Sequence, residues 1–80
     1  MNEKINPQLL HTTNGGAIRV KRNLGLAPDT DVVKWCQNVL RDNTNFTISR
    51  RGKNFYVHDE NYIITINAHS NTIITAHKIN

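Results

Sequence analysis

The chain has very little cysteine. Cys36 is the only one in 80 residues, so no disulfide can form within the chain and no zinc site built on several cysteines is available. Secreted domains of this size usually depend on disulfide bridges, and the opening residues MNEKINPQLL lack the apolar centre of a signal peptide. We therefore expect a cytoplasmic protein, in which the sequon at residues 45–47 marks only the start of a strand.

Acidic residues and long apolar runs are also scarce. Six Asp and Glu stand against ten Lys and Arg, which leaves a formal net charge of +4. This surplus favours an anionic partner such as nucleic acid, although a charge of this size is also ordinary for a small soluble domain. The small number of acidic residues also argues against an inhibitor that mimics nucleic acid. No apolar run approaches the roughly 20 residues that span a bilayer, so we expect no membrane partner.

Two stretches have the spacing of amphipathic helices. In the first, residues 13–25, the apolar positions that share one face are Ala17, Val20 and Leu24. Gly25 lies where a left-handed C-terminal residue is expected. Three side chains can cap this helix: Thr12, Thr13 and Asn14. Gly15 and Gly16 indicate either a loose start of the helix or a backbone that approaches a ligand closely.

The second predicted helix, residues 29–42, has the clearest amphipathic pattern. Its apolar stripe contains Val32, Trp35, Cys36, Val39 and Leu40. Asp29 or Thr30 is expected to cap its first turn. Within the stripe we interpret Trp35 as a core side chain and not as a base-stacking platform. We interpret Cys36 as a small buried hydrophobe and not as a nucleophile.

From residue 45 onwards the apolar period changes to two, which predicts strands. Three polar turns divide residues 45–79 into four such stretches. We therefore predict an α+β fold of order ααββββ, in which two N-terminal helices pack on one face of a four-stranded antiparallel β-meander. Residues 1–80 would form a single domain, and residues 1–10 a tail whose Leu9 and Leu10 dock onto it.

The register of the last hairpin, residues 62–78, decides which side chains share a face. A connection of three or five residues around Ser70 separates polar from apolar side chains best, because it pairs Ile66 with Ile74 or Ala76. The isoleucines would then face the helices. The open face would hold Ser49, Arg51, Tyr56, His58, Thr65, Asn67, His69, Thr75 and His77.

That open face supplies the candidate site. Imidazoles exchange protons near neutral pH, so His69 and His77 are the predicted acid–base pair. Tyr56 is a third catalytic candidate, which can stack on a base or donate a proton. The predicted nucleic-acid-binding residues are Arg19, Lys21, Arg22, Arg50, Arg51, Lys53, Asn67 and Lys78. A polar strand face is also what a solvated antiparallel sheet shows, and this interpretation stays open.

These residues together favour a metal-independent endoribonuclease of the toxin type, acting through the open face of the sheet. A noncatalytic nucleic-acid-binding module, and a small inhibitor or adaptor protein from a mobile element, are the alternatives. The expected partner is RNA, or a protein that is an antitoxin or a target. Four histidines are present, but none are spaced as helical metal ligands or paired with a cysteine. We therefore predict no metal site and no cofactor.

Several stretches also carry a family resemblance: residues 10–13 (LHTT), 19–26 (RVKRNLGL), 31–36 (DVVKWC), 51–57 (RGKNFYV), 64–70 (ITINAHS) and 72–78 (TIITAHK). They resemble a small bacterial family known as a domain of unknown function, number 3781. The resemblance covers nearly the whole chain and implies no established activity.

In element order the chain is more distantly similar to the RelE, barnase and colicin-D-like RNase toxins. That likeness implies N-terminal helices on a four-stranded antiparallel sheet whose open face cleaves RNA. Unlike barnase, this sequence has no acidic general base on the predicted sheet, so catalysis would depend on histidine and basic residues.

Overall fold

A computed structural model of the chain describes residues 5–42 and 46–79. Residues 1–4 of the predicted tail, and residue 45, where the alternating pattern starts, lie outside the described residues. The elements follow in the order η1 Pro7–Leu9, β1 His11–Thr12, α1 Asn14–Leu24, α2 Val32–Asp42, β2 Thr47–Arg51, β3 Asn54–His58, β4 Tyr62–Asn67 and β5 Thr72–Lys78. The predicted α+β class is confirmed.

The sheet has five strands in the described residues, in the order β1-β5-β4-β3-β2. The predicted four-stranded antiparallel meander is therefore wrong: β1 joins β5 as a parallel neighbour, with His11 opposite Thr72 and Thr12 opposite Ile73. Side chains hold this short pairing in place, since Thr12 Oγ1 donates to the Ile73 carbonyl at 2.8 Å and Thr72 Oγ1 lies 2.9 Å from His11 Nε2. A strand of two residues is too short to produce an alternating pattern, so the sequence did not reveal it.

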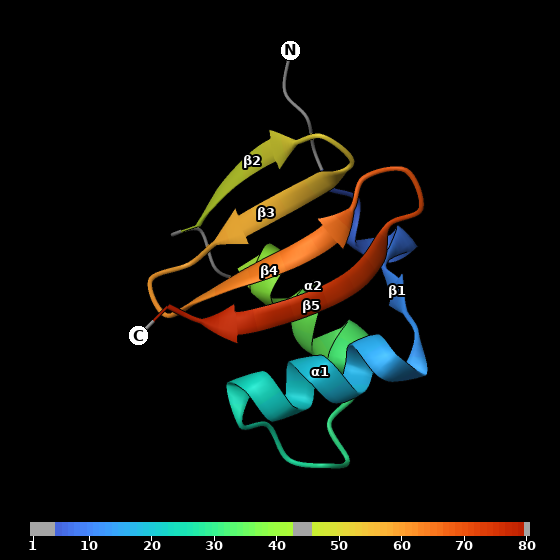
Figure 1. Cartoon of the computed structure of the whole chain (residues 1–80), viewed down its shortest axis with the longest axis vertical. Helices are drawn as coiled ribbons and strands as arrows, with labels where there is room; N and C mark the ends of the chain where they lie inside the picture. The colour runs from blue at the N-terminus through green and yellow to red at the C-terminus, as the bar shows by residue number, and fades with distance from the viewer. Residues whose placement is uncertain (1–4, 43–45, 80) are drawn as a thin grey trace.

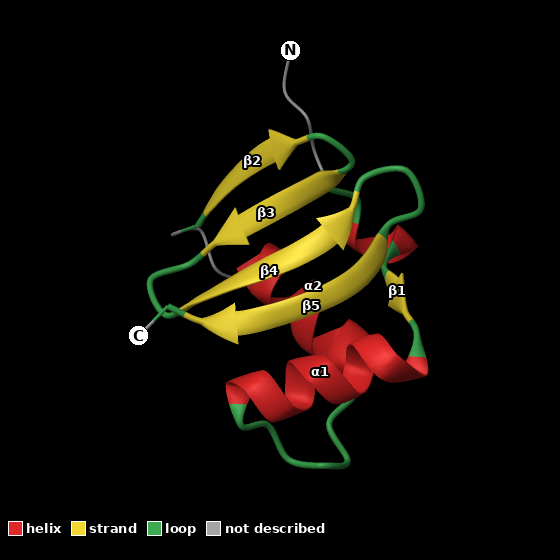
Figure 2. Cartoon of the chain, viewed as in Figure 1, coloured by secondary structure: helices red, strands yellow, loops and turns green. Residues whose placement is uncertain are grey.

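The two helices occupy different positions relative to the sheet. Figures 1 and 2 show α2 behind the sheet and α1 alongside β5. From α1, the Arg19 guanidinium donates to the Ile74 carbonyl from Nε and Nη2, at 3.4 and 3.3 Å. The outer edge of β5 is thus covered by β1 at one end and by α1 beyond it. Covering an edge in this way protects its backbone groups from pairing with another chain.

The ends of the helices follow local capping chemistry. Thr13, one of the three predicted caps, accepts from the Gly16 N–H at 3.0 Å, and Gly25 adopts the left-handed conformation with φ 67°. At α2 the capping side chain is Asp31, not Asp29 or Thr30, because Asp31 Oδ1 accepts from the Lys34 N–H at 3.0 Å. This helix accordingly begins at Val32, later than the predicted residue 29.

Gly16 brings α1 close to the sheet. A Cβ atom at this buried position would lie 2.6 Å from Thr12 Oγ1 and 2.9 Å from the Ile73 carbonyl oxygen. Both distances are shorter than normal van der Waals contact, so a side chain would push the helix away from β5. Of the two interpretations of the glycine pair, close approach applies at Gly16, but the backbone approaches β5 and not a ligand.

The hydrophobic core lies between the sheet and the helices. Its buried side chains are Ile5, Leu10, Val20, Leu24, Val32, Cys36, Phe55, Val57, Ile64, Ile66, Ile73 and Ala76. Leu10 docks as expected, whereas Leu9 is 55% exposed. Burial raises the pKa of the Cys36 thiol to about 12. The thiol is therefore protonated at neutral pH, and the interpretation of Cys36 as a buried hydrophobe is confirmed.

In the β4–β5 hairpin, polar and apolar side chains are segregated by a bulge and not by a connection of odd length. Residues 68–71 connect the strands, an even number instead of the expected three or five. A bulge then shifts the register, so that Thr65 pairs with Thr75 but Ile66 pairs with Ile73. Ile73 is consequently fully buried, and Ile74, which the alternating pattern places in the core, is only partly buried.

Candidate functional site

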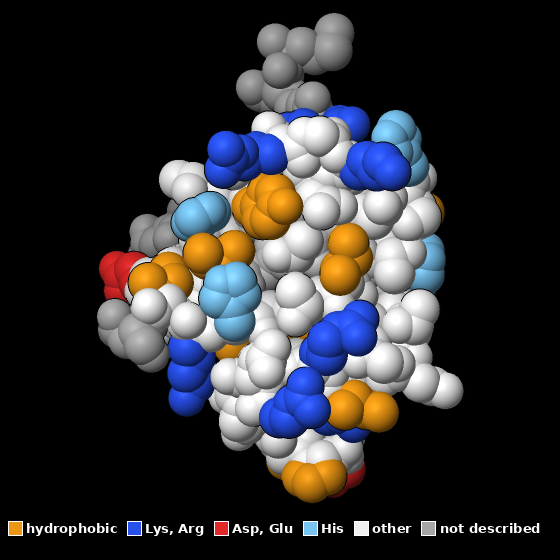
Figure 3. All heavy atoms as spheres, in the orientation of Figure 1, with side chains coloured by type: hydrophobic (Ala, Val, Ile, Leu, Met, Phe, Trp, Pro, Cys, Tyr) orange, Lys and Arg blue, Asp and Glu red, His pale blue; other side chains and the backbone are white. Residues whose placement is uncertain are grey.

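The uncovered face of the sheet carries two cross-strand rows of side chains, which are polar apart from Ile63. One row is Thr47, His58, Ile63 and His77, and the next is Ser49, Tyr56, Thr65 and Thr75. A hollow of about 290 Å³ lies over them, lined by Ser49, Arg51, Tyr56, His58, Ile63 and His77. Figure 3 views this face: histidine and basic side chains are spread across it, and acidic ones show only at its margins.

Two histidines flank the centre of this hollow. His58 on β3 and His77 on β5 are each paired with Ile63 on β4, so they stand on either side of it. Neighbouring strands are about 4.8 Å apart, which places the two histidine Cα atoms roughly 10 Å from one another. Both side chains are exposed. They can therefore reach one ligand from two sides.

The structure does not bring His69 to His77. His69 lies in the connection between β4 and β5, where its N–H donates to Asn67 Oδ1 at 2.9 Å. The stretch of β5 from Thr72 to His77 alone spans roughly 17 Å at the usual rise per residue. The acid–base pair predicted from the sequence therefore cannot act on a single phosphate, and His58 is the histidine that shares the hollow with His77.

Asn67, a predicted nucleic-acid contact, shapes the turn instead. Its Oδ1 accepts from the N–H groups of His69 and Ser70, at 2.9 and 3.0 Å, and lies 3.2 Å from Ser70 Oγ. This pattern is an Asx-type turn, which Asn side chains commonly stabilise. The Asn67 oxygen is thus engaged within the chain.

Besides His77, the predicted residues that lie at the hollow are Tyr56 and Arg51. Tyr56, on β3, is partly buried, and its hydroxyl accepts from Asn54 Nδ2 at 3.4 Å. Arg51 lies at the end of β2 and is exposed. Its neighbour Arg50 is on the other face, where its guanidinium lies 5.4 Å from the Phe55 ring centroid and Nε donates to the Gly52 carbonyl at 2.9 Å. Of the two arginines, only Arg51 lines the hollow.

The remaining predicted cations are dispersed. Arg19 is bound to the β5 backbone, and Lys21 Nζ donates to the Pro28 carbonyl at 2.9 Å in the loop after α1. Arg22 on α1 and Lys53 in the β2–β3 turn are exposed. Lys78 follows His77 and points to the opposite face of the sheet, where it lines a separate pocket. None of these cations lines the hollow with Arg51.

His11 is the histidine that the sequence reasoning left without a role. Its Nδ1 lies 3.2 Å from the Leu9 carbonyl oxygen and its Nε2 lies 2.9 Å from Thr72 Oγ1, which in turn is 2.7 Å from Ser70 Oγ. This chain of hydrogen bonds ties β1 to the start of β5. The sequence pattern does not predict this role of His11, because residues 11 and 72 come together only through the parallel pairing of β1 with β5.

Comparison with known proteins bears on the family. A family model described as "Protein of unknown function (DUF3781)" matches residues 5–77. The chain belongs to the DUF3781 family. The resemblance of the sequence to that family is therefore confirmed. No curated protein and no solved structure matches this DUF3781 chain, so the likeness to RelE, barnase and colicin-D-like toxins has no support from a structural neighbour.

In the described part of this DUF3781 chain, no helix has the length and apolar character needed to cross a membrane. Within the same residues, no three His, Cys, Asp or Glu side chains gather where they could hold a metal ion.

Proposed function

We propose that the chain binds single-stranded RNA on the open face of its sheet. The observation that carries this proposal is the hollow that gathers Arg51, Tyr56, His58 and His77, with no carboxylate among the described residues that line it. An aromatic ring on an open sheet can stack with a base of any sequence, and nearby cations and imidazoles can contact the phosphates. The formal net charge of +4 favours the approach of such a polyanion.

Single-stranded RNA fits this face better than a duplex. Tyr56 can stack only with a base whose face is exposed, and bases in a duplex are already stacked. The hollow is shallow and crosses β2 to β5, so an extended strand could lie along it with one base on Tyr56. The cytoplasm, which the cysteine content predicts as the compartment, would supply such RNA.

Titration of a fluorescently labelled single-stranded RNA at several salt concentrations tests the proposal. We expect saturable binding that weakens as salt rises, because phosphate contacts release counterions. Binding that is insensitive to salt would contradict it. So would a pull-down that returns a stoichiometric protein partner and no RNA, which would favour an inhibitor or adaptor.

RNA cleavage is the second candidate, and it is favoured by the position of His58 and His77 on either side of Ile63. One imidazole would take the proton of a ribose 2′-hydroxyl, whose oxygen attacks phosphorus. The other would protonate the departing 5′-oxygen, which leaves a cyclic phosphate and a 5′-hydroxyl end. Histidine is suited to both steps near neutral pH.

Histidine substitutions separate cleavage from binding. If the chain cleaves RNA, His58→Ala and His77→Ala should each slow cleavage by roughly 100-fold or more, the usual effect of removing a general acid or base. His69→Ala is the matched control and should leave the rate unchanged, because His69 lies in the β4–β5 connection. Product ends are read on a gel in the presence of a chelator. RNA that stays intact, or equal loss in all three variants, would rule out cleavage by this pair.

A further inference from the structure

A second pocket lies on the opposite side of the sheet from the hollow. It has a volume of about 360 Å³ and is lined by Leu24, Leu26, Trp35, Asn61, Tyr62 and Lys78. Tyr62 and Lys78 are cross-strand partners and directly adjoin the Ile63–His77 pair. Successive residues of a strand point to opposite faces, so the two sites stand back to back at one end of the β4–β5 hairpin.

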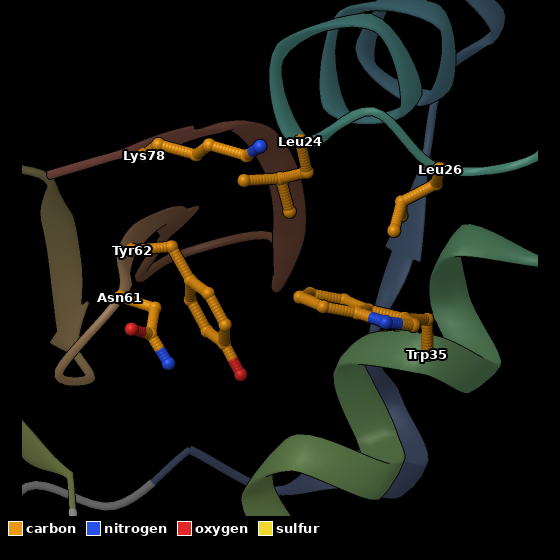
Figure 4. A pocket seen from close by; sticks show the side chains of 6 residues that line it. All are labelled: Leu24, Leu26, Trp35, Asn61, Tyr62 and Lys78. Carbon is orange, nitrogen blue, oxygen red and sulfur yellow. The ribbon is translucent and has the colours of Figure 1, made fainter. Parts of the chain in front are cut away.

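The interior of this pocket is apolar and aromatic. The Trp35 and Tyr62 rings are 5.2 Å apart between centroids and tilted by 54°. Figure 4 shows the Trp35 indole extending toward Tyr62, with Leu24 and Leu26 on the neighbouring side. The two rings and the two leucines form apolar walls against which a planar apolar group can pack. The volume falls within the range of roughly 300–1,000 Å³ that is typical of small-molecule sites.

The polar groups of the pocket favour one negative charge. Lys78 supplies a cation, and Figure 4 shows its side chain extending past Tyr62 toward Leu24, whereas the Asn61 amide lies on the other side of Tyr62. The Asp59 carboxylate is close enough to act on Tyr62, but it is not among the lining residues, and its Oδ1 accepts from the Asn61 backbone N–H at 3.2 Å. Burial, and then the charge of Asp59, raise the pKa of Tyr62. Its hydroxyl is therefore a donor at neutral pH.

We propose that this pocket binds a small aromatic carboxylate. The ring lies against Trp35 and Tyr62, and the carboxylate is held by Lys78 Nζ. One cation matches one anionic group, and the aromatic walls match a planar body. The site is independent of RNA binding, because none of its lining residues belongs to the hollow on the open face.

Trp35 makes the proposal directly measurable, since it is the only tryptophan in the chain and lines the pocket. Phenylpropionate is a suitable probe because a phenyl ring does not absorb where indole is selectively excited. We expect a saturable change in Trp35 fluorescence with a dissociation constant of about a millimolar or tighter, as small ligands of this size achieve. The uncharged phenylpropionamide should bind at least about tenfold more weakly, because it cannot form the charge-assisted bond to Lys78.

A matched pair of lysine variants tests the charge. Lys78→Gln should weaken phenylpropionate binding by about tenfold or more, whereas Lys53→Gln, in the exposed β2–β3 turn, should leave it unchanged. The comparison of phenylpropionate with phenylpropionamide uses the unaltered chain. It therefore tests the role of the charge even if the Lys78→Gln chain does not fold. No saturable change, equal binding of acid and amide, or full binding in a folded Lys78→Gln chain would each overturn the proposal.

Discussion

Tyr56→Ala is expected to weaken binding of single-stranded RNA by roughly 5- to 150-fold, because stacking of one base on an aromatic side chain contributes about 1–3 kcal/mol. Among the described residues that line the hollow, Tyr56 is the only Phe, Tyr or Trp. Tyr56 is partly buried, and its cross-strand neighbours are Ser49 and Thr65. Fluorescence anisotropy of a labelled oligonucleotide measures the effect.

Tyr56→Phe is the control for this substitution. It keeps the ring and removes only the hydroxyl, which makes a long hydrogen bond of 3.4 Å with Asn54. Binding by the Phe variant should therefore stay within about twofold of the unaltered chain. If the Ala variant binds as well as the Phe variant, the ring does not stack with RNA and the open face is a solvated surface.

Ile73→Ala is expected to lower the free energy of unfolding by about 2–5 kcal/mol, whereas Ile74→Ala should cost less than half as much. The two residues are adjacent and chemically identical, but the bulge places them differently. Ile73 is fully buried opposite Ile66, and Ile74 is only partly buried, with its carbonyl bound to Arg19. Urea unfolding followed by Trp35 fluorescence provides the measurement.

The outcome distinguishes two registers of the last hairpin. An unbroken alternation through residues 72–78 places Ile74 in the core and Ile73 on the open face, which would reverse the order of the two costs. Equal costs would mean that neither register describes the hairpin. Thr75 and His77 lie on the open face in either case, so the comparison tests the bulge at Ile73 and Ile74 alone.

Local patterns were sufficient to predict much of the fold. Capping by Thr13, the left-handed Gly25 and the alternating strands all depend on residues close together in the sequence. The fifth strand could not be found in this way. Its two residues pair with a segment about sixty positions away, and the stabilising contact of Thr12 with Ile73 exists only once the chain has folded.

Local patterns also predict part of the candidate site, namely the residues that lie on regular strands. Alternation correctly placed Tyr56, Arg51, His58 and His77 on the open face, since each lies on a regular strand. It fails for His69, because β4 ends at Asn67 and His69 lies in the turn that follows. Alternation also places Arg51, and not Arg50, on the open face, although both arginines are among the predicted nucleic-acid-binding residues. The two differ only in the face to which the end of β2 directs them.

That difference between the two arginines offers the most direct measurement of the central claim. Arg51→Gln and Arg50→Gln remove the same charge, so any difference between them reports position on the sheet and not net charge. For single-stranded RNA, we expect Arg51→Gln to weaken binding and to reduce the slope of log affinity against log salt by about one. Arg50→Gln should leave affinity and slope close to those of the unaltered chain. Equal effects of the two substitutions, or none from either, would contradict RNA binding at the open face.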